Sequence, residues 1–173
     1  MPATPFSVDD FRNLMRQYPA AVTVIATGEA PHRTGLTATA VMSLSMDPMS
    51  IVCAVNRSAY TCQKIIQNQS FTVNTLSQQH IELAKVFSGQ TDLQGDARFA
   101  PEDWCVMRSG APVLTDAVVS LDCTVMQVVD AGTHALIIGQ VDAGQHSKAS
   151  EALLYVDGGW AGVDKMPAIF SKV

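Results

Sequence analysis

The residues best suited to chemistry begin with a run of small side chains at positions 35–48, which predicts a strand that runs into a loop. On an extended chain Thr37 and Thr39 point to one face, and Ala38 and Ala40 point to the other. Small side chains keep the backbone approachable, so a flat, polar ring could lie along the main chain and bond to its N–H groups. The alternative is a tight corner of a barrel, where small residues simply fit.

A second group of polar residues surrounds a predicted strand-to-helix turn. Asn56, Ser58 and Thr61 lie where the N–H groups of a helix N-terminus would point toward an anion. Ordinary capping of the helix by Ser58 is the alternative. Ser43 and Ser45 point to the same face of an extended chain, so both would reach one ligand or both would face solvent.

Three further positions carry groups that could touch a ligand. Phe87 and Ser88 close a predicted helix, and Ser88 either adds a donor or belongs to a plain C-terminal turn after a core phenylalanine. Arg98 could offer its guanidinium to a phosphate, or it is a surface charge. His134 follows a Gly132 turn at the start of a predicted strand, which places it on a rim; a solvated strand-end histidine is the alternative.

Several common motifs are absent from the sequence. Residues 158–162 do not follow the G-x-G-x-x-G pattern, and there is no lysine-bearing phosphate loop, so a nicotinamide nucleotide would bind without a Rossmann domain. No Ser-His-Asp order with an elbow motif is present, which argues against a nucleophilic hydrolase. The histidines and cysteines show no metal-ligand spacing, so no zinc site is expected.

The elements that must position these residues are mostly short strands. Alternating or β-branched patterns predict strands over 21–27, 35–48, 50–55, 71–75, 117–126, 134–141, 153–156 and 160–163. Helices are expected from a cap at Ser7 to Pro19, over 59–68 with Cys62, Ile65 and Ile66 inward, and over 77–87, while 90–116 is expected to be irregular with one or two short elements. Many strands with few helices predict a mainly β fold with helical decoration (α+β), a barrel and not a doubly wound sheet.

Composition narrows the choice of partners. A chain of 173 residues predicts a single domain over 1–173. Apolar residues make up 47% and charged residues 16%, so a partner subunit is expected to cover exposed apolar area. The net charge of −5 and the lack of a basic run make nucleic acid and membrane poor partners. No signal peptide is recognised, and four cysteines without a C-x-x-C pair suit a reducing compartment, so a cytoplasmic location is expected.

An ordered set of short motifs resembles the flavin reductase-like, FMN-binding split-barrel family. The resemblance spans about residues 10–160, and it is carried by the whole set in order and not by any one piece. The motifs are GLTATA at 35–40, SLS at 43–45 with DP at 47–48, VCAVNRS at 52–58, FTVN at 71–74, FSG at 87–89, RF at 98–99, GTH at 132–134 and LLY at 153–155.

The resemblance implies a six-stranded FMN-binding split β-barrel whose bound flavin is FMN, or FAD, with NADH or NADPH as co-substrate. It implies a slot for the flavin ring along Leu36–Ala40, a phosphate site drawing on Asn56, Ser58, Thr61 and Arg98 with Ser43, Ser45, Phe87 and Ser88 nearby, and a catalytic role for His134 where nicotinamide meets flavin. It also implies a homodimer with flavin at the subunit interface.

The resemblance implies one of two enzyme functions. The first is an NAD(P)H-dependent flavin reductase of the kind that supplies reduced flavin to a separate monooxygenase. The second is a corrin reductase of aerobic cobalamin biosynthesis, which reduces cob(II)yrinic acid a,c-diamide through FMN. A non-catalytic flavin-binding electron carrier and an oligomeric interaction module are the alternatives from other classes.

Overall fold

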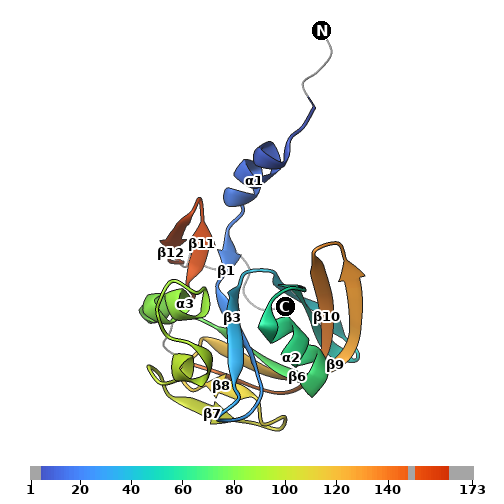
Figure 1. Cartoon of the computed structure of the whole chain (residues 1–173), viewed down its shortest axis with the longest axis vertical. Helices are drawn as coiled ribbons and strands as arrows, with labels where there is room; N and C mark the ends of the chain where they lie inside the picture. The colour runs from blue at the N-terminus through green and yellow to red at the C-terminus, as the bar shows by residue number, and fades with distance from the viewer. Residues whose placement is uncertain (1–4, 148–150, 164–173) are drawn as a thin grey trace, which may run out of the picture.

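The main sheet of the protein has seven antiparallel strands (Figure 1). We analysed a computed structural model, which describes residues 5–147 and 151–163. The strand order is β3-β2-β6-β9-β10-β5-β4. The strands are β2 (Thr23–Thr27), β3 (Thr34–Ala38), β4 (Val41–Met46), β5 (Met49–Asn56), β6 (Ser70–Thr75), β9 (Val119–Ala131) and β10 (His134–His146).

The expectation of a mainly β fold with few helices is confirmed, but the strand count differs from the six that the resemblance implied. The stretch 35–48 is two strands, β3 and β4, which are separated only by Thr39 and Ala40. These two strands occupy opposite edges of the main sheet. Two residues therefore connect the two edges, and the amide of Ala54 on β5 donates to the carbonyl of Ala40 at 2.9 Å.

Two small sheets complete the β structure. β1 (Ala20–Ala21) pairs with the hairpin of β11 (Leu154–Val156) and β12 (Gly159–Ala161), so the predicted strand over 21–27 breaks after its first residue. β7 (Trp104–Val106) pairs with β8 (Pro112–Leu114) within the segment that was expected to be irregular. The β10 strand continues five residues past its predicted end at 141.

In the described part of the chain three α-helices flank the sheets: α1 (Val8–Arg16), α2 (Tyr60–Asn68) and α3 (Ile81–Phe87), with 3-10 turns at Gln78–His80 and Gly95–Phe99. Ser7 caps α1 in a capping box with Asp10, as predicted. On α2, Cys62 and Ile65 are buried as expected, but Ile66 is 41% exposed, and that prediction is wrong. The buried arc of α2 is turned toward Thr61 instead, which lies four residues before Ile65 and therefore on the same side of the helix.

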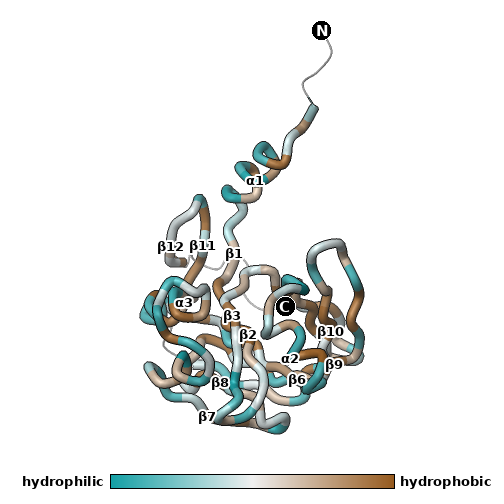
Figure 2. Tube along the Cα trace, viewed as in Figure 1, coloured by the Kyte–Doolittle hydropathy of each residue, from teal (hydrophilic) through white to brown (hydrophobic). Residues whose placement is uncertain are grey.

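Two hydrophobic clusters form the core, and Figure 2 shows hydrophobic segments along the strands that supply them. The first joins β2 to α3 and contains the mutually edge-on rings of Phe87, Phe99 and Trp104. The second lies between the main sheet and α2, and it includes Ile65 and Phe71. Both clusters pack against β3 or its neighbour β2, which holds the predicted ligand strand firmly in place.

Candidate functional site

A pocket of about 540 Å³ opens beside β3. The predicted slot residues Leu36–Ala40 form one wall, and Ala54–Asn56 on β5 with His134 on β10 form another. Phe87 and Ser88 at the end of α3 and the hairpin residues Tyr155 and Trp160 complete the lining, together with Val22 and Gln90. The structure therefore brings together five elements that lie far apart in the sequence.

A second pocket, of about 480 Å³, adjoins the first and shares Leu36, Phe87 and Ser88 with it. Its other lining residues come from the start of β3, the first turn of α2 and the 3-10 turn at Gly95–Phe99: Arg33, Thr34, Gly35, Ala59, Tyr60, Thr61, Gly89, Gln94, Gly95 and Arg98. Together the two pockets follow β3 along its length. Such a site suits a ligand with a flat ring at one end and a polar tail at the other.

The wall formed by β3 uses its backbone more than its hydroxyl groups. The Thr37 hydroxyl donates to the carbonyl of Ala84 at 2.8 Å, which ties β3 to α3. The Gly35 carbonyl accepts from Arg98 at 3.0 Å, on the side of β3 away from β2. In an antiparallel strand the N–H and C=O groups of one residue point to the same side, and every second residue points to that side again. Thr37 lies two residues after Gly35, so its amide also faces this outer edge. The edge strand thus offers free donors to a ligand.

Arg98 is one of two arginines that line the second pocket, and it is half-buried there. Its guanidinium donates to the Gly35 carbonyl at 3.0 Å, to the Thr34 hydroxyl at 3.2 Å and to the Gly95 carbonyl at 3.3 Å. All three acceptors are neutral, and the Phe87 ring lies 5.3 Å below the guanidinium carbon. Burial lowers the pKa of the Arg98 guanidinium from its ordinary value. The positive charge is therefore held in place and available to an anion.

Arg33, the other arginine of this pocket, is already paired. Its guanidinium donates to both carboxylate oxygens of Asp96 at 2.7 Å, and this hydrogen bond lowers the pKa of the Asp96 carboxyl. Asp96 and Arg98 belong to the same 3-10 turn, Gly95–Phe99. The ion pair fixes the turn that presents Arg98 to the pocket, so Arg33 acts as a positioning residue.

The turn before α2 departs from simple capping. Ala59 is the N-cap of α2 and makes no side-chain capping bond, so the alternative of capping by Ser58 is wrong. Instead the Asn56 side-chain oxygen accepts from the Ser58 amide at 2.9 Å and from its hydroxyl at 2.8 Å. Asn56 lines the first pocket and Thr61 the second, where the Thr61 hydroxyl bonds that of Thr34 at 2.9 Å. Ser58 lines neither pocket, and it braces Asn56.

His134 lies at the start of β10 on the rim of the first pocket, as the sequence predicted. Its Nδ1 atom is 2.9 Å from the Thr133 hydroxyl. Its direct partner across the strands is Asn56, which lines the same pocket. The side chain is exposed, so the imidazole is free to meet a second ligand that enters from solvent.

Ser43 and Ser45 lie on β4, outside both pockets. A register shift between the two residues breaks the alternation on which the prediction of equal parity depended. The Ser45 hydroxyl donates to the Asp47 carbonyl at 3.0 Å, within the hairpin that joins β4 to β5. The structure thus gives Ser45 a role in the turn.

The sequence analysis missed the wall formed by the C-terminal hairpin. Tyr155 and Trp160 stack edge to face with their centroids 5.3 Å apart, and both line the first pocket. The two strands of the hairpin correspond to those predicted over 153–156 and 160–163. Its pairing of Tyr155 with Ala20 joins chain segments more than a hundred residues apart, and local patterns carry no signal for that contact.

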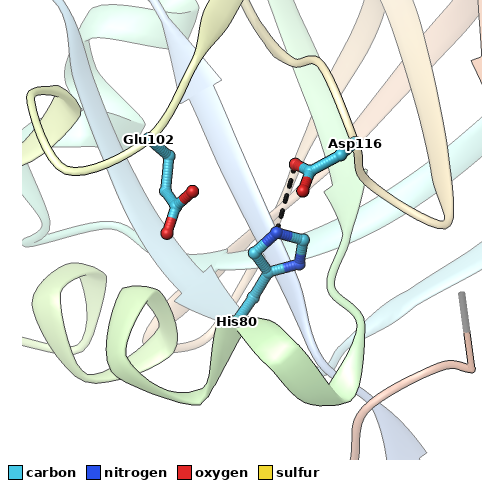
Figure 3. Close-up of side chains that lie close together, drawn as sticks. All are labelled: His80, Glu102 and Asp116. Atoms are coloured by element: carbon cyan, nitrogen blue, oxygen red, sulfur yellow. Dashed lines mark hydrogen bonds and ion pairs between the residues drawn. The ribbon is translucent and has the colours of Figure 1, made fainter.

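A separate cluster of possible metal ligands contains His80, Glu102 and Asp116, whose ligand atoms lie within 4.8 Å of one another (Figure 3). His80 is 2% exposed, and its Nδ1 accepts the Ser77 amide at 3.1 Å. Nε2 therefore carries the proton and donates to Asp116 at 3.1 Å, which leaves the imidazole without a free lone pair for a metal. The spacing argument could not have detected this cluster, which links the start of α3 to the turn before β9.

Across residues 5–147 and 151–163, no helix is long and apolar enough to cross a membrane.

The fold and the site define a small β protein with an elongated ligand slot along one edge of its main sheet. Residues 15–164 match the family model for the flavin reductase like domain, so the chain belongs to that family, as the motifs indicated. It is 38% identical over 146 residues to FMN reductase (NADH) RutF of Agrobacterium fabrum, covering 84% of this chain and 83% of the relative. It is 40% identical over 145 residues to the Acinetobacter baylyi protein of the same name, covering 84% and 76%. The solved structure of flavin reductase PheA2 superposes with a TM-score of 0.83 at 31% identity, covering 92% of this chain and 99% of that one.

Proposed function

We propose that this protein is an NADH-dependent flavin reductase that transfers hydride from NADH to FMN bound along β3. The observation that carries the proposal is the pair of adjoining pockets, which share Leu36, Phe87 and Ser88 and end at Arg98. Two curated relatives that match most of this chain are named FMN reductase (NADH), which supports the same nucleotide and flavin here.

The residues present fit FMN, because an uncompensated guanidinium lies at one end of the slot and edge-strand amides lie beside it. When bound, FMN accepts at its N5 position the hydride that leaves C4 of the nicotinamide. Arg98 and the first turn of α2 bind the phosphate, and the amide of Thr37 orients the ring. His134 and the aromatic pair Tyr155–Trp160 hold the dinucleotide over the slot. Catalysis then depends on orientation, without an acid–base residue.

Anaerobic mixing of the FMN-loaded protein with NADH tests this function directly. We expect complete bleaching of the flavin absorbance by one equivalent of NADH, and slower bleaching by NADPH. Tight FMN binding without reduction by either nucleotide would identify an electron carrier. If the protein binds no flavin, the oligomeric interaction module would be the remaining alternative. Cobalt-corrin reduction faster than free reduced FMN achieves would identify a corrin reductase.

We also propose that the protein is a homodimer whose contact face includes the outer side of β5 and β10. Val52 lies directly opposite Ile138, and Ala54 lies opposite Leu136, so these four apolar side chains share one face. The residues between them, such as Cys53 and Ile137, point into the core. Asn56 and His134 continue the same rows into the first pocket, so a second copy on this face would border the flavin site.

Three further aspects complete the proposal. Residues 1–173 are proposed to form one domain with a six-stranded split barrel, in which β3 and β4 act as one bent strand. The two-residue connection between these strands and the hydrogen bond between Ala54 and Ala40 support closure of the sheet into a barrel.

Reduced FMN is proposed to leave for a separate monooxygenase, since the rim at His134 is exposed. A cytoplasmic location is proposed because the four cysteines are free thiols.

A further inference from the structure

The helix α1 presents an apolar face that no residue within 5–147 or 151–163 covers. Phe11, Leu14, Met15 and Tyr18 fall on one side of the helix with Val8, and the five side chains are 48–73% exposed. The opposite side carries Asp9, Asp10, Arg12, Asn13 and Arg16. Figure 1 shows α1 standing clear of the main sheet. No residue of α1 is buried.

A helix of this length needs a partner surface. Isolated helices shorter than about 12–15 residues are marginal in water, and α1 has nine. Its capping box adds on the order of 1 kcal/mol, which does not replace tertiary packing. An amphipathic face of this kind is stabilised when it packs against apolar surface.

The C-terminal end of α1 is attached to the β11–β12 hairpin. The Arg16 carbonyl accepts from the Asp157 amide at 2.5 Å, and the Gln17 side chain donates to the Asp157 carboxylate at 2.9 Å. Asp157 lies at the tip of the β11–β12 hairpin, and Ala20 pairs with Tyr155 on β11. The helix is thus fixed at its C-terminal end to a hairpin, and it points outward from there.

The same chain carries a second uncovered group of apolar side chains, the β4 patch, defined as Met42, Leu44, Met46 and Met49. These residues are 48–86% exposed at one edge of the main sheet. Met42 lies directly opposite Val52, so the β4 patch continues the outer face of β5 that is proposed above to contact a second copy. Methionine side chains adapt well to a helix that packs on them.

We propose that α1 is an intersubunit arm whose apolar face packs on the β4 patch of a second copy. The inference rests on the homodimer proposed above, and it adds the contact that holds the two subunits together. Each copy supplies one arm and one patch, so a two-fold arrangement covers all four surfaces at once. Five exposed aromatic and aliphatic side chains on each arm and four on each patch would leave water together in this arrangement. A standard stable interface buries roughly 1,600 Å² in total, so other residues of the two copies would also take part.

Charge placement on the two faces of α1 provides a matched test of the contact. Leu14→Asp places a carboxylate on the apolar face, and Asn13→Asp places the same charge on the polar face one residue away. We expect Leu14→Asp, and Met42→Asp on the patch, to raise the dissociation constant of the FMN-loaded dimer at least tenfold in a sedimentation concentration series. Asn13→Asp is expected to leave it unchanged. Equal dimer affinity in Leu14→Asp and Asn13→Asp would overturn the inference.

Cross-linking between two differently labelled copies tests the contact without depending on affinity. Cys105 is the exposed thiol, so Leu14→Cys and Met42→Cys are each made in a Cys105→Ser background. With a short bismaleimide, we expect a covalent heterodimer from the mixture of the two proteins and little from either alone; Asn13→Cys mixed with Met42→Cys is the control. No heterodimer from a dimeric mixture would overturn the arm and leave the homodimer standing. A wild-type monomer at every concentration would overturn both, and FMN reduction by NADH in the same samples would report separately on the proposed activity.

Discussion

At the scale of single residues, the site separates side chains that hold the fold from side chains left free for a ligand. The hydroxyls of Thr37 and Thr61 are both engaged within the protein, although the sequence analysis had offered both residues as candidates for ligand binding. Arg98 and His134 retain donors or ring edges that face the pockets. The sequence analysis singled out these four positions, but only the three-dimensional partners show which groups remain available.

Arg98 is expected to recognise the phosphate that distinguishes FMN from riboflavin. Arg98→Gln keeps a polar side chain in place but removes the charge. A hydrogen bond to a charged group contributes about 1.5–3 kcal/mol, so the dissociation constant for FMN should rise about ten- to a hundredfold, whereas that for riboflavin should change little. Fluorescence titration with both flavins measures the two constants. Arg108→Gln, a change at an exposed arginine, is the control. Equal losses for FMN and riboflavin would place the phosphate elsewhere.

His134 is expected to position the nicotinamide and not to hold the flavin. His134→Ala should retain FMN, while stopped-flow reduction by NADH slows, or its half-saturating concentration rises, by about ten- to a hundredfold, which corresponds to one lost positioning contact. His146→Ala provides a matched control, because His146 is an exposed histidine at the far end of the same strand. A reduction rate that is unchanged at both low and saturating NADH would make His134 an ordinary solvated histidine.

At the scale of elements, the sequence predicted most strands and helices to within a few residues, because alternation and capping are local signals. The strand over 35–48 is the instructive exception. Its small residues allowed a tight corner of a barrel, but they did not show that the chain would leave one sheet edge at Ala38 and join the other at Val41. Sheet order depends on contacts between distant segments. Local patterns predicted the two strands that carry Tyr155 and Trp160. Their place on the pocket depends on contacts with distant segments, so the sequence did not predict it.

Close packing inside the main sheet depends on a glycine in β10. A Cβ atom at Gly139 would lie 2.5 Å from Cζ of the buried Phe71 ring and 3.0 Å from Cβ of Cys123. Gly139→Ala should therefore lower the free energy of unfolding by about 1–3 kcal/mol, the usual cost of overpacking a core. Urea denaturation measures the difference. At Gly159 the nearest atom to an added Cβ is 3.8 Å away, so Gly159→Ala should be nearly neutral. Similar stabilities for the two variants would contradict this account of the core.

At the scale of the whole molecule, one sheet is apolar on both sides over part of its area. Ile137 and Val55 point into the core, while Leu136, Ile138, Val52 and Ala54 point outward and remain only partly covered. A low charged fraction in the sequence indicated that some apolar surface would need a partner, but it could not locate that surface. The strand register locates it, and it leads directly into the first pocket through Asn56 and His134.

This continuity predicts that subunit contact and flavin binding are lost together. Ile138→Lys places a charge at the centre of the outer face without touching the core side of β10, so the chain should fold but dissociate into monomers, because an unpaired charge is costly to bury. FMN affinity should fall in parallel, since the second copy would no longer border the slot. Sedimentation of the FMN-loaded protein and flavin titration of the same samples measure both effects. Gln63→Lys, at an exposed position on α2 that lies outside both pockets and off the outer face of β5 and β10, should change neither. An Ile138→Lys variant that remains dimeric with full FMN affinity would show that the subunits meet through another face, and a monomer with full affinity would show that one chain completes the site alone.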